Sequence, residues 1–152
     1  MDQDIFRKTY REMNERACVF EKSNLSGACR CTQAERFYLA EREGVHCKSE
    51  QAQEKCIDFM GLLRQQSRFA LKSNDVSEVL PHGKAMRIQV GGMRGVYLAV
   101  HDEEEAPVQI EDVHSLLQRA IGKFGDLSKL PYQQIMIQVA AYKGRTRGKR
   151  NR

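Results

Sequence analysis

The stretch Ser49–Lys72 reads SEQAQEKCIDFMGLLRQQSRFALK and shows the pattern from which most of this chain is built. Apolar side chains recur at helical spacing and form one stripe, while Gln, Glu, Lys and Arg occupy the other side. The stripe comprises Ala52, Cys56, Met60, Leu63 and Ala70, with Ile57 and Phe59 beside it. This pattern predicts an amphipathic helix from Ser49 to about Lys72 that buries the stripe.

Comparable signals predict helices in other parts of the chain. Residues 1–16 place Ile5, Phe6, Tyr10 and Met13 at spacings of four and three. Thr32-Gln33-Ala34-Glu35 matches a capping box, which predicts a helix from Thr32 to about Gly44. Two further helices are expected over Ile110–Phe124, which Gly125 would end, and over Tyr132–Tyr142.

The stretch Lys84–Val100 is also predicted to be helical, although it contains three glycines. Met86, Val90, Met93, Tyr97 and Val100 share one helical face. Gly91 and Gly95 are four residues apart and would let a second helix approach closely. A strand is the alternative, because residues 86–90 alternate with period two.

These elements predict an all-α fold, an irregular bundle of about five to six helices. A single helical domain is expected over residues 1–142, with a cysteine-cluster part at 1–60 and a helical core at 84–142. Residues 143–152 are expected to form a flexible, disordered basic tail. No stretch reaches the roughly 20 apolar residues of a membrane-spanning helix. The acidic start of the chain does not resemble a secretory signal, so a cytoplasmic location is expected.

The five cysteines all lie within the first 56 residues of the chain: Cys18, Cys29, Cys31, Cys47 and Cys56. Thiolates bind zinc and iron far better than oxygen ligands do. A reducing cytosol and the odd number of thiols favour metal binding over disulfides. Three of the thiols precede predicted helices, where the helix dipole and free N–H groups would favour thiolate.

The sequence predicts a site of four thiolates that uses Cys29, Cys31 and Cys47. Cys18 is a slightly better fourth ligand than Cys56, because loops supply ligands more easily than a packed helical face. His46 could replace one thiolate. An iron–sulfur cluster, of the 4Fe-4S type, is favoured over zinc, since structural zinc usually supports small modules with little core.

The cysteine spacing, C-x10-C-x-C-x15-C-x8-C, leaves other interpretations open, because it matches neither common zinc modules nor bacterial ferredoxins. Some or all of the cysteines could be buried apolar residues, since free cysteine is among the most buried residue types. The Cys29–Cys31 pair could also cycle through a disulfide as a redox sensor.

The C-terminal residues 143–152 carry a concentrated positive charge. They hold six of the 25 basic side chains and no acidic one, whereas the preceding residues hold the other 19 and all 20 acidic side chains. The six are Lys143, Arg145, Arg147, Lys149, Arg150 and Arg152. Such a tail can bind nucleic-acid phosphates or an acidic protein partner, or can simply keep the protein soluble.

These features lead to two functional hypotheses. The first is an iron–sulfur protein that acts in electron transfer, as a sensor, or as an accessory subunit of a larger redox complex with a protein partner. The alternative is a structural zinc-binding helical module whose basic tail binds nucleic acid. No hydrolase, phosphate-loop or dinucleotide-binding motif is present, so the sequence does not identify an enzyme.

Overall fold

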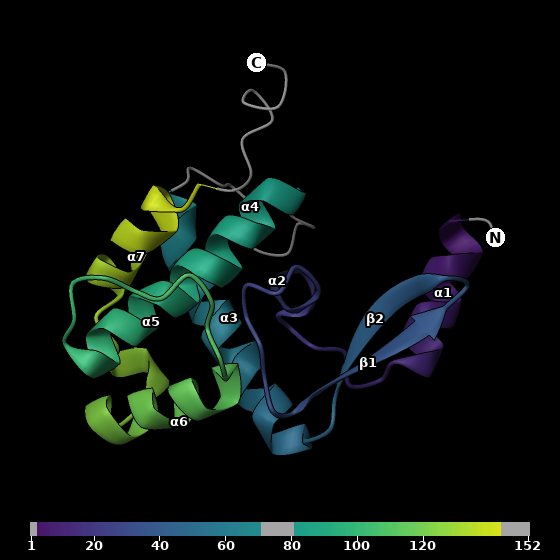
Figure 1. Cartoon of the computed structure of the whole chain (residues 1–152), viewed down its shortest axis with the longest axis horizontal. Helices are drawn as coiled ribbons and strands as arrows, with labels where there is room; N and C mark the ends of the chain where they lie inside the picture. The colour runs from purple at the N-terminus through teal and green to yellow at the C-terminus, as the bar shows by residue number, and fades with distance from the viewer. Residues whose placement is uncertain (1–2, 71–80, 144–152) are drawn as a thin grey trace, which may run out of the picture.

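The computed structural model of the chain describes residues 3–70 and 81–143 (Figure 1). The N-terminal half contains two helices, a hairpin of two strands and one long helix; the C-terminal half is helical. In chain order the elements are α1 (Gln3–Met13), α2 (Glu21–Leu25), β1 (Ala34–Leu39), β2 (Arg42–Cys47), α3 (Glu50–Ala70), α4 (His82–Met86), a π-helical turn (Arg87–Gly91), α5 (Gly92–His101), α6 (Val113–Phe124), a 3-10 turn (Leu127–Lys129) and α7 (Tyr132–Ala141).

The chain is mostly helical, which confirms the predicted fold class. α4, the π-helical turn and α5 run on without a break, because Arg87 and Gly92 at the junctions keep right-handed helical backbone angles. The described ranges therefore contain six helices and one small hairpin. The strand alternative for residues 86–90 is wrong.

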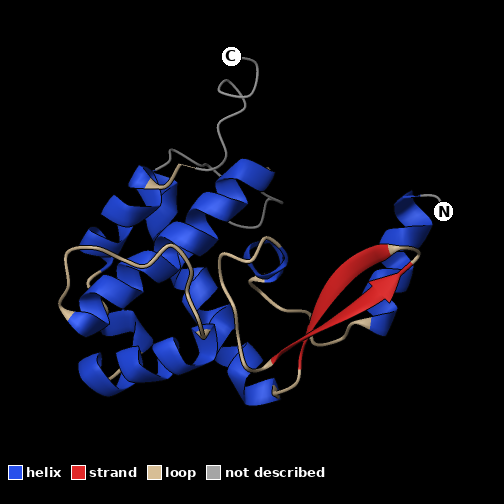
Figure 2. Cartoon of the chain, in the orientation of Figure 1, coloured by secondary structure: helices blue, strands red, loops and turns tan. Residues whose placement is uncertain are grey.

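In the helical body, α5 packs against α6 and α7 (Figure 1). α3 completes the core by packing against α7 and the π-helical turn. The largest fully buried side chains belong mainly to these helices: Phe59, Leu63, Val90, Met93, Val96, Ile110, Val113, Leu117, Ile135 and Val139. The hairpin and α1 form an arm beside this body, as Figure 2 shows. α2 and the start of α3 lie where the arm meets the body.

Gly91 and Gly95 lie where α7 approaches closely, as the sequence predicts. A Cβ atom on Gly91 would lie 2.6 Å from the Cα atom of Val139, and one on Gly95 would lie 2.7 Å from the Cα atom of Ile135. Real Cβ atoms do not approach backbone so closely. The two glycines therefore allow α5 and α7 to pack backbone against backbone.

The predicted helix from Thr32 to Gly44 is wrong, because this stretch forms the antiparallel hairpin of β1 and β2. Ala34 pairs with Cys47 and Leu39 with Arg42. Ala40 and Glu41 both have positive φ, as the tight two-residue turn of a hairpin requires. The Thr32 hydroxyl, expected to cap this helix, donates instead to the carboxylate of Asp112, 3.1 Å away.

Contacts with α1 and α2 explain why the hairpin prevails over the local helical signal. The ring of Phe37 on β1 packs against Tyr10, with 5.8 Å between the ring centres. The backbone N–H of Val45 on β2 donates to the Glu21 carboxylate, 2.8 Å away. The Tyr10 hydroxyl donates to the same carboxylate. These contacts join residues far apart in sequence, so short-range patterns do not reveal them.

The first helix is shorter than predicted and buries less. α1 ends at Met13, so Cys18 lies in the following loop rather than at the end of the helix. Asn14 is buried, and its side-chain amide donates to the carbonyl of Val45 at 3.1 Å. Ile5 and Met13, two of the apolar residues at helical spacing, are 57% and 63% exposed.

Two predictions concern residues outside the described ranges. One is that the long helix that begins at Ser49 is broken at residues 73–75. The other is the disordered tail from residue 144 onward. Lys143 is described and exposed, directly after α7. In the described part of the chain, no helix is both long enough and apolar enough to cross a membrane.

Candidate metal centre

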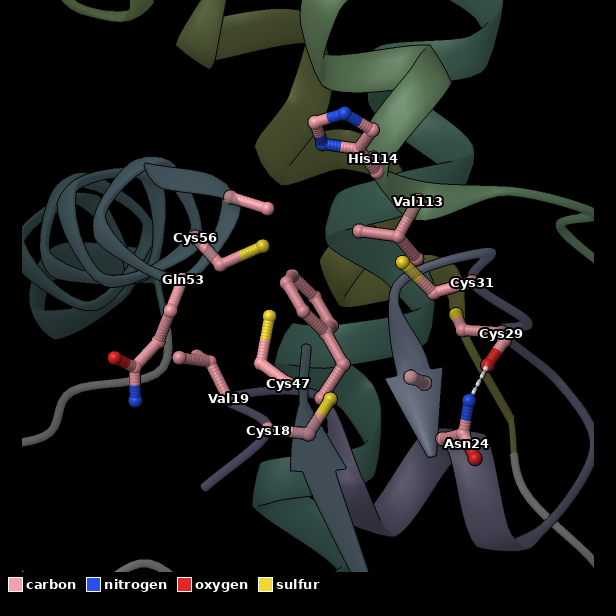
Figure 3. A pocket seen from close by; sticks show the side chains of 13 residues that line it. Cys18, Val19, Asn24, Cys29, Cys31, Cys47, Gln53, Cys56, Val113 and His114 are labelled. Atoms are coloured by element: carbon pink, nitrogen blue, oxygen red, sulfur yellow. Dashed lines mark hydrogen bonds between the residues drawn. The ribbon is translucent and has the colours of Figure 1, made fainter. Parts of the chain in front are cut away.

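All five cysteines line one small cavity at the junction between the hairpin arm and the helical body (Figure 3). They come from the loop before α2, the loop before β1, the end of β2 and the second turn of α3. None of the five forms a disulfide. Apolar side chains complete most of the lining: Val19, Phe20, Ala34, Ala52 and Val113.

The positions of Cys18 and Cys47 depend on the pairing of the hairpin with the preceding loop. The backbone N–H of Cys18 donates to the carbonyl of Val45 at 2.9 Å. The N–H of Cys47 donates to the carbonyl of Arg16 at 2.7 Å. The Cys47 thiol also donates to the carbonyl of Ser49, 3.2 Å away. The loop that carries Cys18 therefore pairs with β2, which holds these two thiols beside one another.

The prediction that Cys29 and Cys31 precede a helix is wrong, since the hairpin follows them. A different helix start lies next to Cys31, however. The backbone N–H groups of Gln33 and His114 oppose the rise in the pKa of its thiol, and His114 lies in the first turn of α6. Helix N–H groups thus reach Cys31 from a segment about 80 residues along the chain.

Cys29 is held differently from the other four cysteines. It is fully buried. Its backbone N–H donates to the carbonyl of Ser23 at 3.1 Å, and its carbonyl accepts from the side-chain amide of Asn24 at 3.2 Å. A β-bridge also joins it to Ile110. Its thiol interacts with the Ser23 hydroxyl and lies near the charge of Arg94. Cys29 therefore ties the loop before β1 to the helical body.

The remaining four cysteines form one electrostatically connected group: Cys18, Cys31, Cys47 and Cys56. The charges of Cys31 and Cys47 raise the pKa of Cys18, that of Cys47 raises the pKa of Cys31, and those of all three raise the pKa of Cys56. No cysteine is among the causes of the pKa shift at Cys29. Figure 3 shows these four side chains around a common space, with Cys29 to one side next to Asn24. These four thiols are therefore linked electrostatically, whereas the sequence suggests a ligand set built on Cys29, Cys31 and Cys47.

Burial is the largest cause of the raised pKa values of the thiols. It raises the pKa of Cys18 to about 12 and that of Cys29 to about 11. It also raises the pKa of Cys56, with smaller contributions from Cys18, Cys31 and Cys47. The pKa of Cys31 is raised by burial too, despite the N–H groups that oppose the shift. Without a metal, Cys18, Cys29, Cys31 and Cys56 are therefore neutral thiols at pH 7. A metal must displace the protons of the thiols that it binds.

The raised pKa values predict that the metal-free protein loses stability in alkali. Above the ordinary thiol value of 9.0, the unfolded chain gives up its thiol protons while the folded chain keeps them. The free energy of unfolding should therefore fall as the pH rises from about 9 through about 11. Urea unfolding of chelator-treated protein across this range measures the slope. A Cys29→Ala variant should show a shallower fall, and equal slopes in both proteins would contradict the assignment to Cys29.

In the described part of the chain, the cysteines do not form a site for a single metal ion. Among the described residues, no three His, Cys, Asp or Glu side chains are placed to hold one metal ion. A tetrahedral zinc with Zn–S bonds of about 2.3 Å needs its sulfurs only about 3.8 Å apart. A cluster places iron and sulfide between its ligands, so its thiolates stand further apart. The cavity itself is small, about 20 Å³, so a cluster also requires the thiols to turn outward.

Two histidines lie differently with respect to the cavity. His46, suggested as a substitute ligand, does not line the cavity; its ring nitrogen lies 3.3 Å from the Asn14 side chain. Strand alternation explains this, because neighbours on β2 point to opposite faces and Cys47 faces the cavity. His114 lies on the cavity wall. No local sequence signal reveals it, since α6 comes from the far half of the chain.

In comparisons with protein-family models, curated proteins and solved structures, no match to this chain was found. The fold and the site define it as a helical protein with a cavity lined by cysteines.

Proposed function

We propose that this protein binds an iron–sulfur cluster, of the 4Fe-4S type, in the cavity lined by its cysteines. One observation carries the proposal: all five thiols of the chain, from four separate segments, line a single cavity. Cysteines that serve only as apolar residues have no reason to gather in this way. The apolar lining also suits a cluster, because low solvent access helps to set cluster potentials.

Cys18, Cys31, Cys47 and Cys56 are the proposed ligands. They are the electrostatically linked set, and four thiolates are the usual ligand number for such a cluster. Backbone N–H groups that hydrogen-bond to Cys18 and Cys31 would stabilise the negative charge on their sulfurs. Cys29 is assigned to packing, since its thiol and its backbone are both engaged with α2 and the helical body.

The location of the site suits electron exchange with a protein partner. Cys18, Cys31 and Cys56 are only partly buried, so one side of a bound cluster would lie near the surface. A cluster supplies one-electron chemistry, while the protein sets its potential and its accessibility. We therefore propose an electron-transfer protein, a sensor or an accessory subunit of a redox complex, working in the cytoplasm.

The test is metal and sulfide analysis of the full-length protein purified without oxygen. The expected result is brown protein with broad visible absorption, about four irons and as much acid-labile sulfide per chain. Treatment with a chelator and an oxidant should bleach the colour. Colourless protein that carries stoichiometric zinc would overturn the proposal in favour of a structural zinc module. Protein that binds neither metal would leave the thiols as a buried or redox-active group and would also overturn it.

A further inference from the structure

The arm, formed by α1, β1 and β2, is joined covalently to the helical body at three places (Figure 2). Three segments of the chain make these links: residues 14–20, 26–33 and 48–49. Cys18 and Cys31 lie within the first and second links, and Cys47 directly precedes the third. Cys56, the fourth proposed ligand, lies on α3 in the body and lines the same cavity (Figure 3). Every link between the arm and the body therefore has a proposed ligand in it or next to it.

Within the described ranges, the arm contributes no side chain to the main hydrophobic core. The core draws on the helices from α3 to α7 and on the segments beside α2, and none of its members belongs to α1, β1 or β2. Val45 and Cys47 on β2 are buried, but they lie outside this core. Burial of apolar surface is the main stabilising contribution in a folded protein, and a segment with little of it opens at low cost in free energy.

Hydrogen bonds connect the arm to α2. The Tyr10 hydroxyl and the backbone N–H of Val45 both donate to the carboxylate of Glu21. The guanidinium of Arg36 on β1 donates to the carbonyl of Asn24 at 2.6 Å. Each of these bonds adds little net stability, because water replaces it when the arm separates. The described contacts therefore leave the attachment of the arm dependent on whatever else joins the three links to the body.

We infer that occupation of the cysteine site controls the attachment of the arm. A cluster bound by Cys18, Cys31, Cys47 and Cys56 ties the three links to one another and to α3, which clamps the arm to the body. In the metal-free protein the arm separates from the body more easily, because the binding energy of a metal site is also local folding energy. This inference rests on the proposed function and favours its sensor role, since the arm then responds to the loading of the site.

The test is hydrogen–deuterium exchange of the full-length protein, read by mass spectrometry, in an iron-loaded sample and a metal-free, reduced sample. Iron and sulfide analysis of the loaded sample checks the proposed function separately. We expect the backbone amides of β1 and β2 to exchange at least about tenfold faster in the metal-free sample, because the arm then opens at lower cost. The amides of α5 and α6 should change by less than about twofold, because these helices carry no proposed ligand.

A Glu21→Gln variant weakens the hydrogen bonds to the arm and leaves all the cysteines in place. In the metal-free protein it should speed the exchange of the hairpin amides by a further factor of about three. In the loaded protein the effect should be smaller, because the clamped arm exchanges through openings that leave α2 in place. The matched control is Glu54→Gln, which makes the same change at an exposed position on α3 and should behave like the unmodified protein.

Equal exchange of the hairpin amides in the loaded and metal-free samples would overturn this inference and leave the proposed cluster intact. So would an equal loss of protection in the hairpin and in α5, because the site would then stabilise the whole protein rather than the arm. Equal effects of Glu21→Gln and Glu54→Gln would contradict separation of the arm from α2. Protein that binds no metal would fail the iron analysis and overturn both proposals.

Discussion

Replacing Cys31 with serine is expected to abolish iron binding, and the same result is expected for Cys18, Cys47 and Cys56. Serine is a poor ligand for a soft metal, and each of the four thiols belongs to the electrostatically linked group that lines the cavity. Iron and sulfide analysis after anaerobic purification measures the loss. Circular dichroism should show that the helices of the body persist, because α5, α6 and α7 contain no cysteine.

Cys29→Ala is the control for this series and decides between the two ligand sets. Cys29 lies on the same cavity, but its thiol interacts with Ser23 and not with the other cysteines. We expect this variant to keep its iron, with a loss of stability within the usual 0.5–3 kcal/mol of a single substitution. Iron loss in folded Cys29→Ala, together with full retention in Cys56→Ser, would favour the ligand set suggested by the sequence.

Replacing Gly91 with alanine is expected to destabilise the helical body markedly. The new Cβ would lie 2.6 Å from the Cα atom of Val139 and 2.8 Å from the carbonyl oxygen of Gln138. Backbone cannot rotate away as a side chain can, so α7 must separate from the π-helical turn that ends at Gly91. Overpacking of this kind costs about 1–3 kcal/mol. Urea denaturation followed by circular dichroism gives the change in the free energy of unfolding.

Gly61→Ala is the matched control, since Gly61 lies within α3 and a Cβ there would meet nothing within 4 Å. Alanine at such a site should stabilise the protein by about 0.5–1 kcal/mol, because it has the higher helix propensity. The difference between the two variants therefore isolates the contact between α5 and α7. A Gly91→Ala protein as stable as Gly61→Ala would show that this contact is not close in solution.

The sequence by itself determined the helical class of this protein and most of its helices. Amphipathic spacing is a local property, so α3, α6 and α7 could be placed from their own residues. The close approach at Gly91 and Gly95 was also predictable, because two glycines on one helical face have few other uses there. The clustering of cysteines in the first 56 residues is likewise visible without a structure.

Only the tertiary structure decided the hairpin and the grouping of the thiols. The Thr32 capping box is a genuine local helical signal, but contacts from Tyr10 and Glu21 stabilise strands instead. That change removes the helix expected after Cys31 and brings α6 to it from the other half of the chain. Sequence spacing cannot reveal which thiols face one another, because this depends on how the hairpin, α3 and α6 pack together.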